Sequence, residues 1–336
     1  MPLTLEDIAR MSGVSRSTVS RVINDDRNVN EATRRKVWEV IQNINFQPNL
    51  AARGLAAGRT QVLGLVIPMA VASVFVDPYF PLLIQGISAA CTPRGYTIML
   101  WLAQPDFEQR MASQILNNSL IDGVIVASAV QDDPIVTALI QAQSMPFIMV
   151  GRDMEDAPVS YVDVDNRAGA GMAVEYLLRQ GHERVATITG PQNMVAGYDR
   201  FQGYLEALAR YHRVVDPQLV TGGLFDEASG YEAMLALLPH KPDGLFVASD
   251  MMAMGAMRAI QEAGLKIPDD IALIGFDDIP AAALTTPPLT TVRQPIMRCG
   301  SMAAEVLIDM IGNPPAAPRR MILPTELVLR GTCKIE

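Results

Sequence analysis

The stretch "VSRSTVSRVIN" (residues 14–24) places two arginines and four hydroxyl side chains on a short segment without an acidic residue. Arginine can donate two hydrogen bonds to a guanine, while serine and threonine can reach phosphates or base edges. The first 60 residues carry nine Lys/Arg and six Asp/Glu, a net charge of +3, although the whole chain of 336 residues carries −9. A basic head on an acidic chain indicates that only the head approaches a polyanion.

Three helices are expected to position these side chains. Thr4 and Asp7 have the spacing of a capping box, and Gly13 permits a tight turn after the first helix. Ser15 is placed to cap the second helix and Asn30 to cap the third. A small residue in the first helix, the glycine turn and the second short helix have the layout of a helix-turn-helix. The second helix of such a motif lies in the major groove, with its N-terminal residues against base edges.

From Gln61 onward, short apolar runs alternate with helical stretches. This alternation predicts parallel, doubly wound sheets, and the number of strands favours two α/β lobes over one open sheet. The apolar run Leu63–Val76 is interpreted as a strand and its following loop. We expect strands at residues 62–68, 96–101, 122–128, 146–150, 184–190, 244–249 and 271–276. We expect helices at residues 80–92, 107–117, 134–143, 166–180, 198–211, 227–238 and 251–263.

Two acidic residues directly follow strands of this body. Asp250 comes after "GLFVAS", and Asp277 comes after "IALIGF". Ligands of open α/β sheets bind beyond the carboxyl ends of the strands, so both carboxylates are candidates for a ligand cleft. Asp250 has an equally good alternative role as the N-cap of the helix that follows it.

Several classes of protein are disfavoured by the composition and motifs. A hydrophobic content of 49% with 19% charged residues indicates a globular core. Cys91, Cys299 and Cys333 are far apart without metal-site spacing, which favours buried thiols in a reduced, cytoplasmic setting. No signal peptide or membrane span is recognised. "AGAGMAVEY" lacks the third glycine of a dinucleotide-binding motif, and "GLAAGRT" lacks the P-loop lysine. The three histidines are isolated. We therefore expect no enzyme, no cofactor and no metal site.

The chain resembles the LacI/GalR family of bacterial transcription regulators. The resemblance rests on "TLEDIARMSGVSRSTVSRVIN", "VNEATRRKV" and "FQPNLAARGLAAGRT", and it continues through "GHERVATITGP", "ASDMMAMGAMRAI", "DIALIGFDD" and "PPLTTVRQP". It implies an all-α helix-turn-helix DNA-binding head plus a hinge helix, followed by a two-lobe α/β body like the periplasmic binding proteins. The implied domains are residues 1–47 for the head, 48–60 for the hinge and 61–336 for effector binding and dimerisation. Lobe 1 would comprise about 61–161 and 291–324, and lobe 2 about 162–290 and 325–336.

The resemblance also implies which residues contact DNA. Arg16, Ser17 and Arg21 would read operator bases. The hinge helix, about residues 49–57 with Ala52 on it, would enter the minor groove and insert Leu55 as an apolar wedge, which kinks the duplex. Contacts to the phosphate backbone are implied for Ser15, Thr18, Ser20, Asn24, Thr33 and Asn49.

An effector is implied in the cleft between the lobes. Arg200 and Asp277 match the effector-binding arginine and aspartate of the family, and together they suit the vicinal hydroxyls of a sugar. Phe225 matches a position where relatives stack an aromatic ring on the ligand, whereas Asp278 is expected to be structural. The further candidates for the cleft wall are Asp77, Tyr79, Arg152, Ser249 and Asp250.

These implications predict a cytoplasmic repressor of a carbohydrate-utilisation operon. A pseudo-palindromic operator of double-stranded DNA requires two heads, so a homodimer is expected. Gly151 stands where some relatives have an effector-binding acid, and the adjacent Arg152 leaves an acidic or phosphorylated effector open. A solvent-exposed Arg152 without a role in binding is an equally good alternative. A protein co-effector is a further alternative. A doubly wound enzyme and a periplasmic binding protein are the other classes considered.

Overall fold

The computed structural model describes residues 3–23, 26, 28–44, 46, 59–69, 71–102, 108–153 and 157–334. The chain divides into two compact units, Met1–Thr60 and Gln61–Glu336. The first unit is called the head below and the second the body.

The head folds as three helices: α1 (Leu5–Ser12), α2 (Arg16–Ile23) and α3 (Glu31–Asn43). The predicted capping box is confirmed, since the Asp7 amide donates to Thr4 Oγ1 at 3.3 Å and the Thr4 amide donates to Asp7 Oδ2 at 3.0 Å. Gly13 ends α1 in the left-handed region, at φ 66°. A small apolar core then joins the three helices; its buried members are Ile8, Ala9, Val19, Val22, Ile23, Val37 and Ile41.

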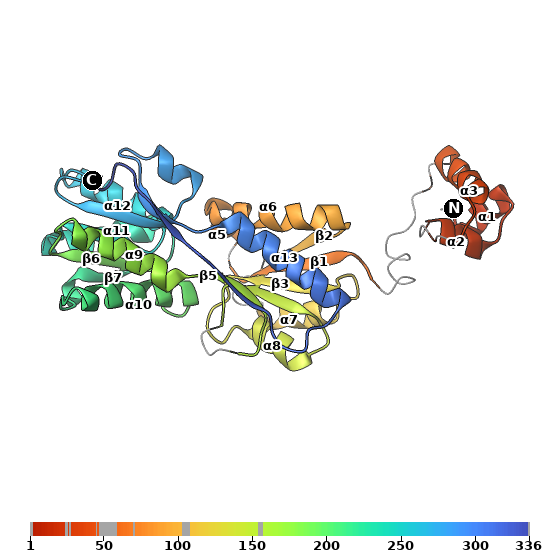
Figure 1. Ribbon diagram of the computed structural model, residues 1–336, viewed down its shortest axis with the longest axis horizontal. Coiled ribbons are helices and arrows are strands. Elements are labelled where there is room, and N and C mark those ends of the chain that lie inside the picture. The colour runs from red at the N-terminus through yellow and green to blue at the C-terminus, as the bar shows by residue number, and fades with distance from the viewer. Residues whose placement is uncertain are drawn as a thin grey trace. The chain divides into compact units, whose positions relative to one another are not determined.

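The first lobe of the body is built on a parallel six-stranded sheet in the order β11-β5-β4-β3-β1-β2. Helices α6 and α13 pack together on one face of this sheet, and α7 and α8 pack on the other (Figure 1). The elements are β1 (Val62–Ile67), α5 (Val71–Val76), α6 (Tyr79–Cys91), η1 (Thr92–Arg94), β2 (Thr97–Leu102), α7 (Glu108–Leu116), β3 (Gly123–Ala127), α8 (Pro134–Ala142), β4 (Phe147–Val150), β5 (Tyr161–Val164), α13 (Ile296–Gly312) and β11 (Arg320–Leu323).

The second lobe has a six-stranded sheet in the order β12-β10-β9-β8-β6-β7, in which only the edge strand β12 runs antiparallel among the described strands. Helices α9 and α10 pack together against this sheet, and α11 packs with α12. The elements are α9 (Asn166–Arg179), β6 (Val185–Thr189), α10 (Val195–Arg210), η3 (Pro217–Leu219), β7 (Val220–Gly222), α11 (Glu227–Leu237), η4 (Leu238–His240), β8 (Gly244–Val247), α12 (Asp250–Glu262), β9 (Ala272–Asp277), η5 (Pro280–Leu284), β10 (Thr290–Arg293) and β12 (Glu326–Val328).

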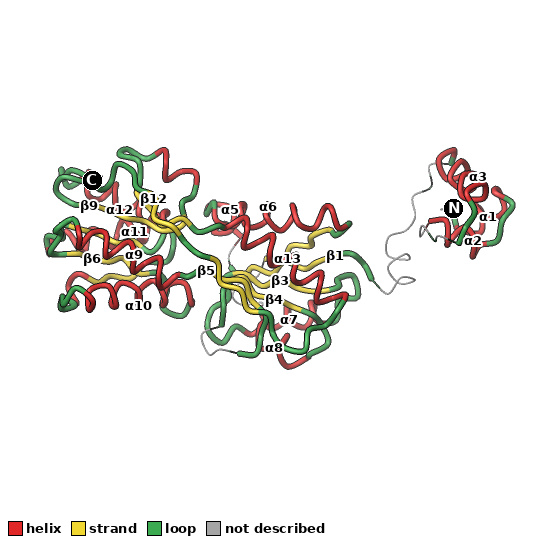
Figure 2. Tube along the Cα trace, viewed as in Figure 1, coloured by secondary structure: helices red, strands yellow, loops and turns green. Residues whose placement is uncertain are grey.

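The chain passes between the lobes at three places. It leaves the first sheet after β5, returns to the first lobe after β10 and leaves again between β11 and β12. Figure 2 shows the chain passing between the lobes near β5 and β12. Because β5 and β10 end at the junction, the residues that follow them lie at the base of the space between the lobes.

The expected strands and helices of the body are all present, together with several elements that the sequence patterns do not predict. Residues 71–76 form the short helix α5 instead of the expected loop. The β-branched residues of this segment do not favour a helix locally, so the helix was not predicted. Burial of Val74 in the first lobe anchors the segment. The helix α13 is not among the expected helices, although its buried residues Ile296, Ala303 and Leu307 have helical spacing. The three-residue edge strand β7 is too short for a periodic signal.

Candidate functional site

The exposed face of α2 carries the side chains that the sequence assigns to DNA. Arg16, Ser17 and Arg21 are exposed, opposite the buried residues of the same helix. Arg16 Nε lies 3.0 Å from Glu6 Oε1, and Arg21 Nε lies 3.9 Å from Asp26 Oδ2. Such exposed ion pairs contribute little stability and are readily exchanged for phosphate or base contacts. The helix therefore carries two solvent-exposed arginines.

The other residues predicted to contact DNA differ in their exposure and in their hydrogen bonds. Ser15 Oγ accepts a hydrogen bond from the Thr18 amide at 3.1 Å, so Ser15 caps α2 as predicted. The Thr33 amide donates to Asn30 Oδ1 at 2.8 Å at the start of α3, and the Ser20 side chain is half-buried. Asn24, Asn49, Ala52 and Leu55, including the predicted hinge helix, lie outside the described residues.

A cleft lies between the two lobes of the body and is lined by residues from both. Seven of the eight residues predicted for an effector line it; they are Asp77, Tyr79, Arg152, Arg200, Phe225, Ser249 and Asp277. Apolar side chains, among them Met69, Phe80 and Val195, complete the wall. The structure thus brings together residues that are far apart in the sequence, at the strand ends where a ligand is expected.

Arg200 is the buried centre of the cleft's polar groups, with only 4% of its surface exposed. Its Nε donates to Asn166 Oδ1 at 2.9 Å, and its Nη1 donates to the Ala248 carbonyl at 2.6 Å and to Asp277 Oδ1 at 3.3 Å. The guanidinium also lies 3.7 Å from the centre of the Phe276 ring. These contacts fix the arginine in one orientation before any ligand arrives.

Asp277, the last residue of β9, combines a rare backbone conformation with a buried side chain. Its backbone has φ 123°, a conformation that side-chain-bearing residues rarely adopt, and Gln294 Nε2 donates to its Oδ1 at 2.5 Å. Burial raises the pKa of Asp277 to about 7, although the adjacent Arg200 guanidinium lowers it. Backbone strain and a buried carboxylate both disfavour the folded state, and such features concentrate at functional sites.

Phe225 contributes an aromatic face to the cleft. Its backbone is also left-handed, at φ 65°, and its ring lies against Gly190, where an added Cβ would come within 2.3 Å of the ring carbon Cζ. A glycine is therefore required at position 190 for the ring to keep its place. An exposed aromatic face beside hydrogen-bonding groups is suited to the apolar face of a sugar ring.

Arg152 lies at the mouth of the cleft and is already paired. Its Nη2 donates to Asp199 of α10, and its Nε lies 3.8 Å from Asp163 Oδ2. About a third of the Arg152 side chain is exposed. The arginine thus bridges the two lobes, since it follows β4 while Asp199 belongs to the second lobe.

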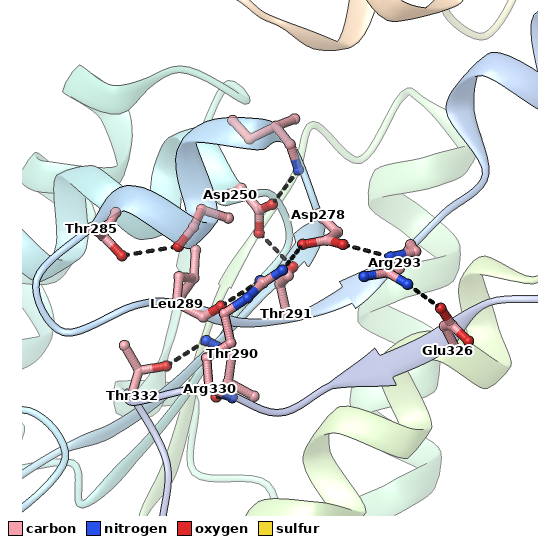
Figure 3. A network of polar contacts seen from close by, with 12 residues as sticks. Asp250, Asp278, Thr285, Leu289, Thr290, Thr291, Arg293, Glu326, Arg330 and Thr332 are labelled. Atoms are coloured by element: carbon pink, nitrogen blue, oxygen red, sulfur yellow. Dashed lines mark hydrogen bonds and ion pairs between the residues drawn. The ribbon is translucent and has the colours of Figure 1, made fainter.

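Asp250 lies behind the cleft wall, which corrects the prediction that it lines the site. It is fully buried; its Oδ1 accepts from Thr291 Oγ1 at 2.5 Å and its Oδ2 from the Ile279 amide at 3.0 Å (Figure 3). The alternative role as helix N-cap is also wrong, because Ser249 Oγ accepts from the Met252 amide and caps α12. Asp250 instead ties the loop after β9 to β10.

Asp278 is part of the same structural network, as predicted. Its Oδ2 accepts from Arg293 Nε at 2.6 Å and its Oδ1 from Arg330 Nη2 at 2.6 Å (Figure 3). Arg293 also donates to Glu326 Oε1 at 2.5 Å, which joins β10 to β12 beside the passages between the lobes.

Sequence reasoning missed four polar residues of the cleft: Ser128, Asp163, Asn166 and Gln294. Asn166 Nδ2 donates to Asp163 Oδ1 at 3.2 Å, which extends the polar contacts of Arg200 toward β5. Asp163 and Gln294 flank two passages between the lobes, so their place in the site follows from the lobe crossings. The only local signal was a polar residue at the end of an apolar strand.

No group of three or more His, Cys, Asp or Glu within the described ranges is arranged to hold a metal ion. No helix among the described residues is both long enough and apolar enough to cross a membrane. The three cysteines are free and buried, as predicted.

Comparison with known proteins agrees with both units. Residues 4–49 match the family described as "Bacterial regulatory proteins, lacI family", and residues 174–333 match the "Periplasmic binding protein-like domain". The HTH-type transcriptional regulator CelR of Thermobifida fusca is 38% identical over 331 residues, which cover 97% of each chain. The ribose operon repressor of Escherichia coli strain K12 is 35% identical over 98% of this chain and 99% of its own.

Solved structures show the same similarity. A CelR–cellobiose complex has a TM-score of 0.79 and 36% identity, covering 98% of this chain and 100% of its own. The lac repressor dimer bound to operator and the anti-inducer ONPF has a TM-score of 0.87 and 26% identity, covering 99% of each chain. With a helix-turn-helix head, a two-lobe body and relatives that span its whole length, the chain belongs to the LacI family of bacterial regulatory proteins.

Proposed function

We propose that this protein is a transcriptional repressor whose hold on operator DNA is controlled by a neutral, sugar-like effector bound in the cleft. The observation that carries the proposal is the buried Arg200–Asp277 pair, which meets Asn166 on one side and Gln294 on the other. Guanidinium and amide groups offer donors beside carboxylate acceptors. A sugar hydroxyl both donates and accepts, so it fits such a mixed set.

The charge of the cleft favours a neutral effector over an acidic or phosphorylated one. Asp77, Asp163 and Asp277 line the cleft, whereas its two arginines already pair with carboxylates. An added phosphate would have to displace one of these buried carboxylates or face it at close range, and both are unfavourable. Arg152, which left the acidic alternative open, has its charge compensated by Asp199 and Asp163.

The relatives support the same class of effector. One has been solved with cellobiose, and another is named for the ribose operon. The lac repressor has been solved as a dimer on its operator, which supports a homodimer that places two α2 helices on a pseudo-palindromic site. In this proposal the protein works in the cytoplasm, where operator DNA is found, and it is a regulator and not an enzyme.

A thermal-shift titration of the full chain tests the effector class. The probes are ribose, glucose and cellobiose, each with a phosphorylated counterpart where one exists, and a ligand of the folded state raises the unfolding temperature. We expect a neutral sugar to raise it and to do so no longer in Asp277→Asn, while Glu206→Gln, which changes an exposed pair with Arg167, responds normally. Stabilisation by sugar phosphates alone would favour the acidic alternative.

The same sugar then has to change DNA binding. Operator DNA is obtained by selection from random double-stranded DNA, and affinity is followed by fluorescence anisotropy at fixed salt, because phosphate contacts make affinity salt-dependent. We expect the sugar that stabilises the parent protein to shift operator affinity in the parent and not in Asp277→Asn. An operator affinity that is insensitive to a bound sugar would overturn the proposed control.

A further inference from the structure

Two contacts close one flank of the cleft, and both reach the same short segment of the second lobe, residues 193–199. The Gln131 amide of the first lobe donates to the Asn193 carbonyl at 2.7 Å. Arg152 donates to Asp199. The lobes are therefore in contact along this flank.

Arg152 has a second carboxylate within reach in its own lobe. Asp163 is 6% exposed, and its Oδ2 is buried without a hydrogen-bond partner among the described residues. That oxygen lies 3.8 Å from Arg152 Nε, just beyond a hydrogen bond. The other oxygen, Oδ1, is satisfied by the Val164 amide at 2.8 Å and by Asn166 Nδ2.

A buried carboxylate oxygen without a donor is costly, and here the nearest donor is held by another acid. Separation of the lobes would carry Asp199 away with α10, while Arg152, two residues after β4, would stay beside Asp163 on the adjacent strand β5. A small rotation of the Arg152 side chain would then complete the bond to Asp163 Oδ2. Opening the cleft would thus break the pair with Asp199 and tighten the existing pair with Asp163, so Arg152 would keep a partner.

We propose that Arg152 is a positioning residue that is shared between Asp199 in the closed body and Asp163 in the open body, and so sets the balance between the two states. Two alternative partners for one charge are the kind of element whose equilibrium a ligand can bias. Effector affinity then depends on how much of the protein is already closed. Only this last consequence rests on the proposed function.

Substitutions of Asp199 and Asp163 should therefore shift the balance between the closed and the open body in opposite directions. Asp199→Asn removes the partner of the closed state and favours opening. Asp163→Asn removes the charge that attracts Arg152 in the open state and favours closure, while its Oδ1 can still accept from Val164 and Asn166. A merely structural role would make both substitutions loosen the body. Glu206→Gln, in an ion pair within the second lobe, is the matched control.

The Gln131 amide provides a native reporter, because its hydrogen bond spans the lobes. Its hydrogen–deuterium exchange is measured in the full-length protein without ligand at pH 7.5, where local opening controls the rate. We expect exchange to accelerate roughly two- to fivefold in Asp199→Asn and to slow by a similar factor in Asp163→Asn, which is the size of change that loss of one ion pair of this kind produces. Glu206→Gln should match the parent.

A change of the same sign in both variants, or no change in either, would overturn the switch. The second arm measures affinity for whichever neutral sugar raises the unfolding temperature, and we expect it to fall in Asp199→Asn and rise in Asp163→Asn. Because the exchange arm needs no ligand, its failure leaves the proposed function intact. A protein that binds no sugar but shows opposite exchange shifts would refute the proposed effector class and retain the switch.

Discussion

Replacing Asp277 by asparagine is expected to stabilise the protein while it removes the effector response. Asp277 is 7% exposed, and burial raises its pKa to about 7 from an ordinary value of 3.8. Arg200 Nη1 and Gln294 Nε2 both donate to Oδ1, so the asparagine carbonyl can accept the same two bonds. The substitution therefore removes a disfavoured charge with little loss of geometry.

The size and sign of the effect follow from linkage. The folded protein binds this proton more tightly than the unfolded chain, so the aspartate's contribution to stability declines as pH rises from about 4 to about 7 and is constant above. The rise of this pKa to about 7 lowers the free energy of unfolding by about 4 kcal/mol at pH 8. At pH 5 the loss is less than half of that. Asp277→Asn should recover most of this free energy at pH 8. Buried Asp250, whose pKa is raised by burial and then by the Asp277 charge, benefits as well.

The assay is urea unfolding followed by circular dichroism at pH 5 and pH 8, with Glu206→Gln as the control. We expect Asp277→Asn to raise the midpoint at both values and more at pH 8, with the slope unchanged. A variant less stable than the parent at pH 8 would refute the reasoning, because Arg200 would then stabilise the Asp277 charge by more than burial disfavours it. A gain independent of pH would show that relief of strain, and not of charge, is responsible.

Three further outcomes test other parts of the molecule. Arg16→Ala should weaken binding to the selected operator roughly 5- to 150-fold and relax the preference at one symmetric pair of bases, measured by anisotropy on single-base variants; an equal loss on every sequence would mean that Arg16 contacts only phosphate. Gly190→Ala should displace the Phe225 ring and lower sugar affinity at least tenfold by calorimetry without changing effector-free DNA binding; unchanged affinity would remove the ring from the site. Thr291→Val leaves one oxygen of buried Asp250 without its donor and should destabilise the body by about 2 kcal/mol in urea unfolding; an unaltered midpoint would show that this hydrogen bond contributes no net stability.

Local patterns in the sequence were sufficient for most elements but not for every residue of the site. Helix caps such as Thr4 and Asn30 depend on neighbours three residues away, and buried strands depend on a continuous apolar run, so both could be predicted. Asp250 shows the limit. Its sequence context matches that of Asp277, yet one carboxylate faces the cleft and the other meets Thr291, and the difference arises from β10, which is distant in the sequence.

The cleft residues Asp163, Asn166 and Gln294 were missed because only the passages between the lobes bring them to the site. A continuous polar chain runs from Arg152 through Asp163 and Asn166 to Arg200 and then to Asp277 and Gln294. Asp163 lies at the passage that leaves the first sheet and Gln294 at the passage that returns, so this chain follows the segments about which the lobes must turn. A ligand bound to Arg200 or Asp277 would therefore contact a chain of residues that reaches both passages. The network of Asp278, Arg293 and Glu326 is satisfied within the second lobe, which keeps that lobe rigid as the passages move.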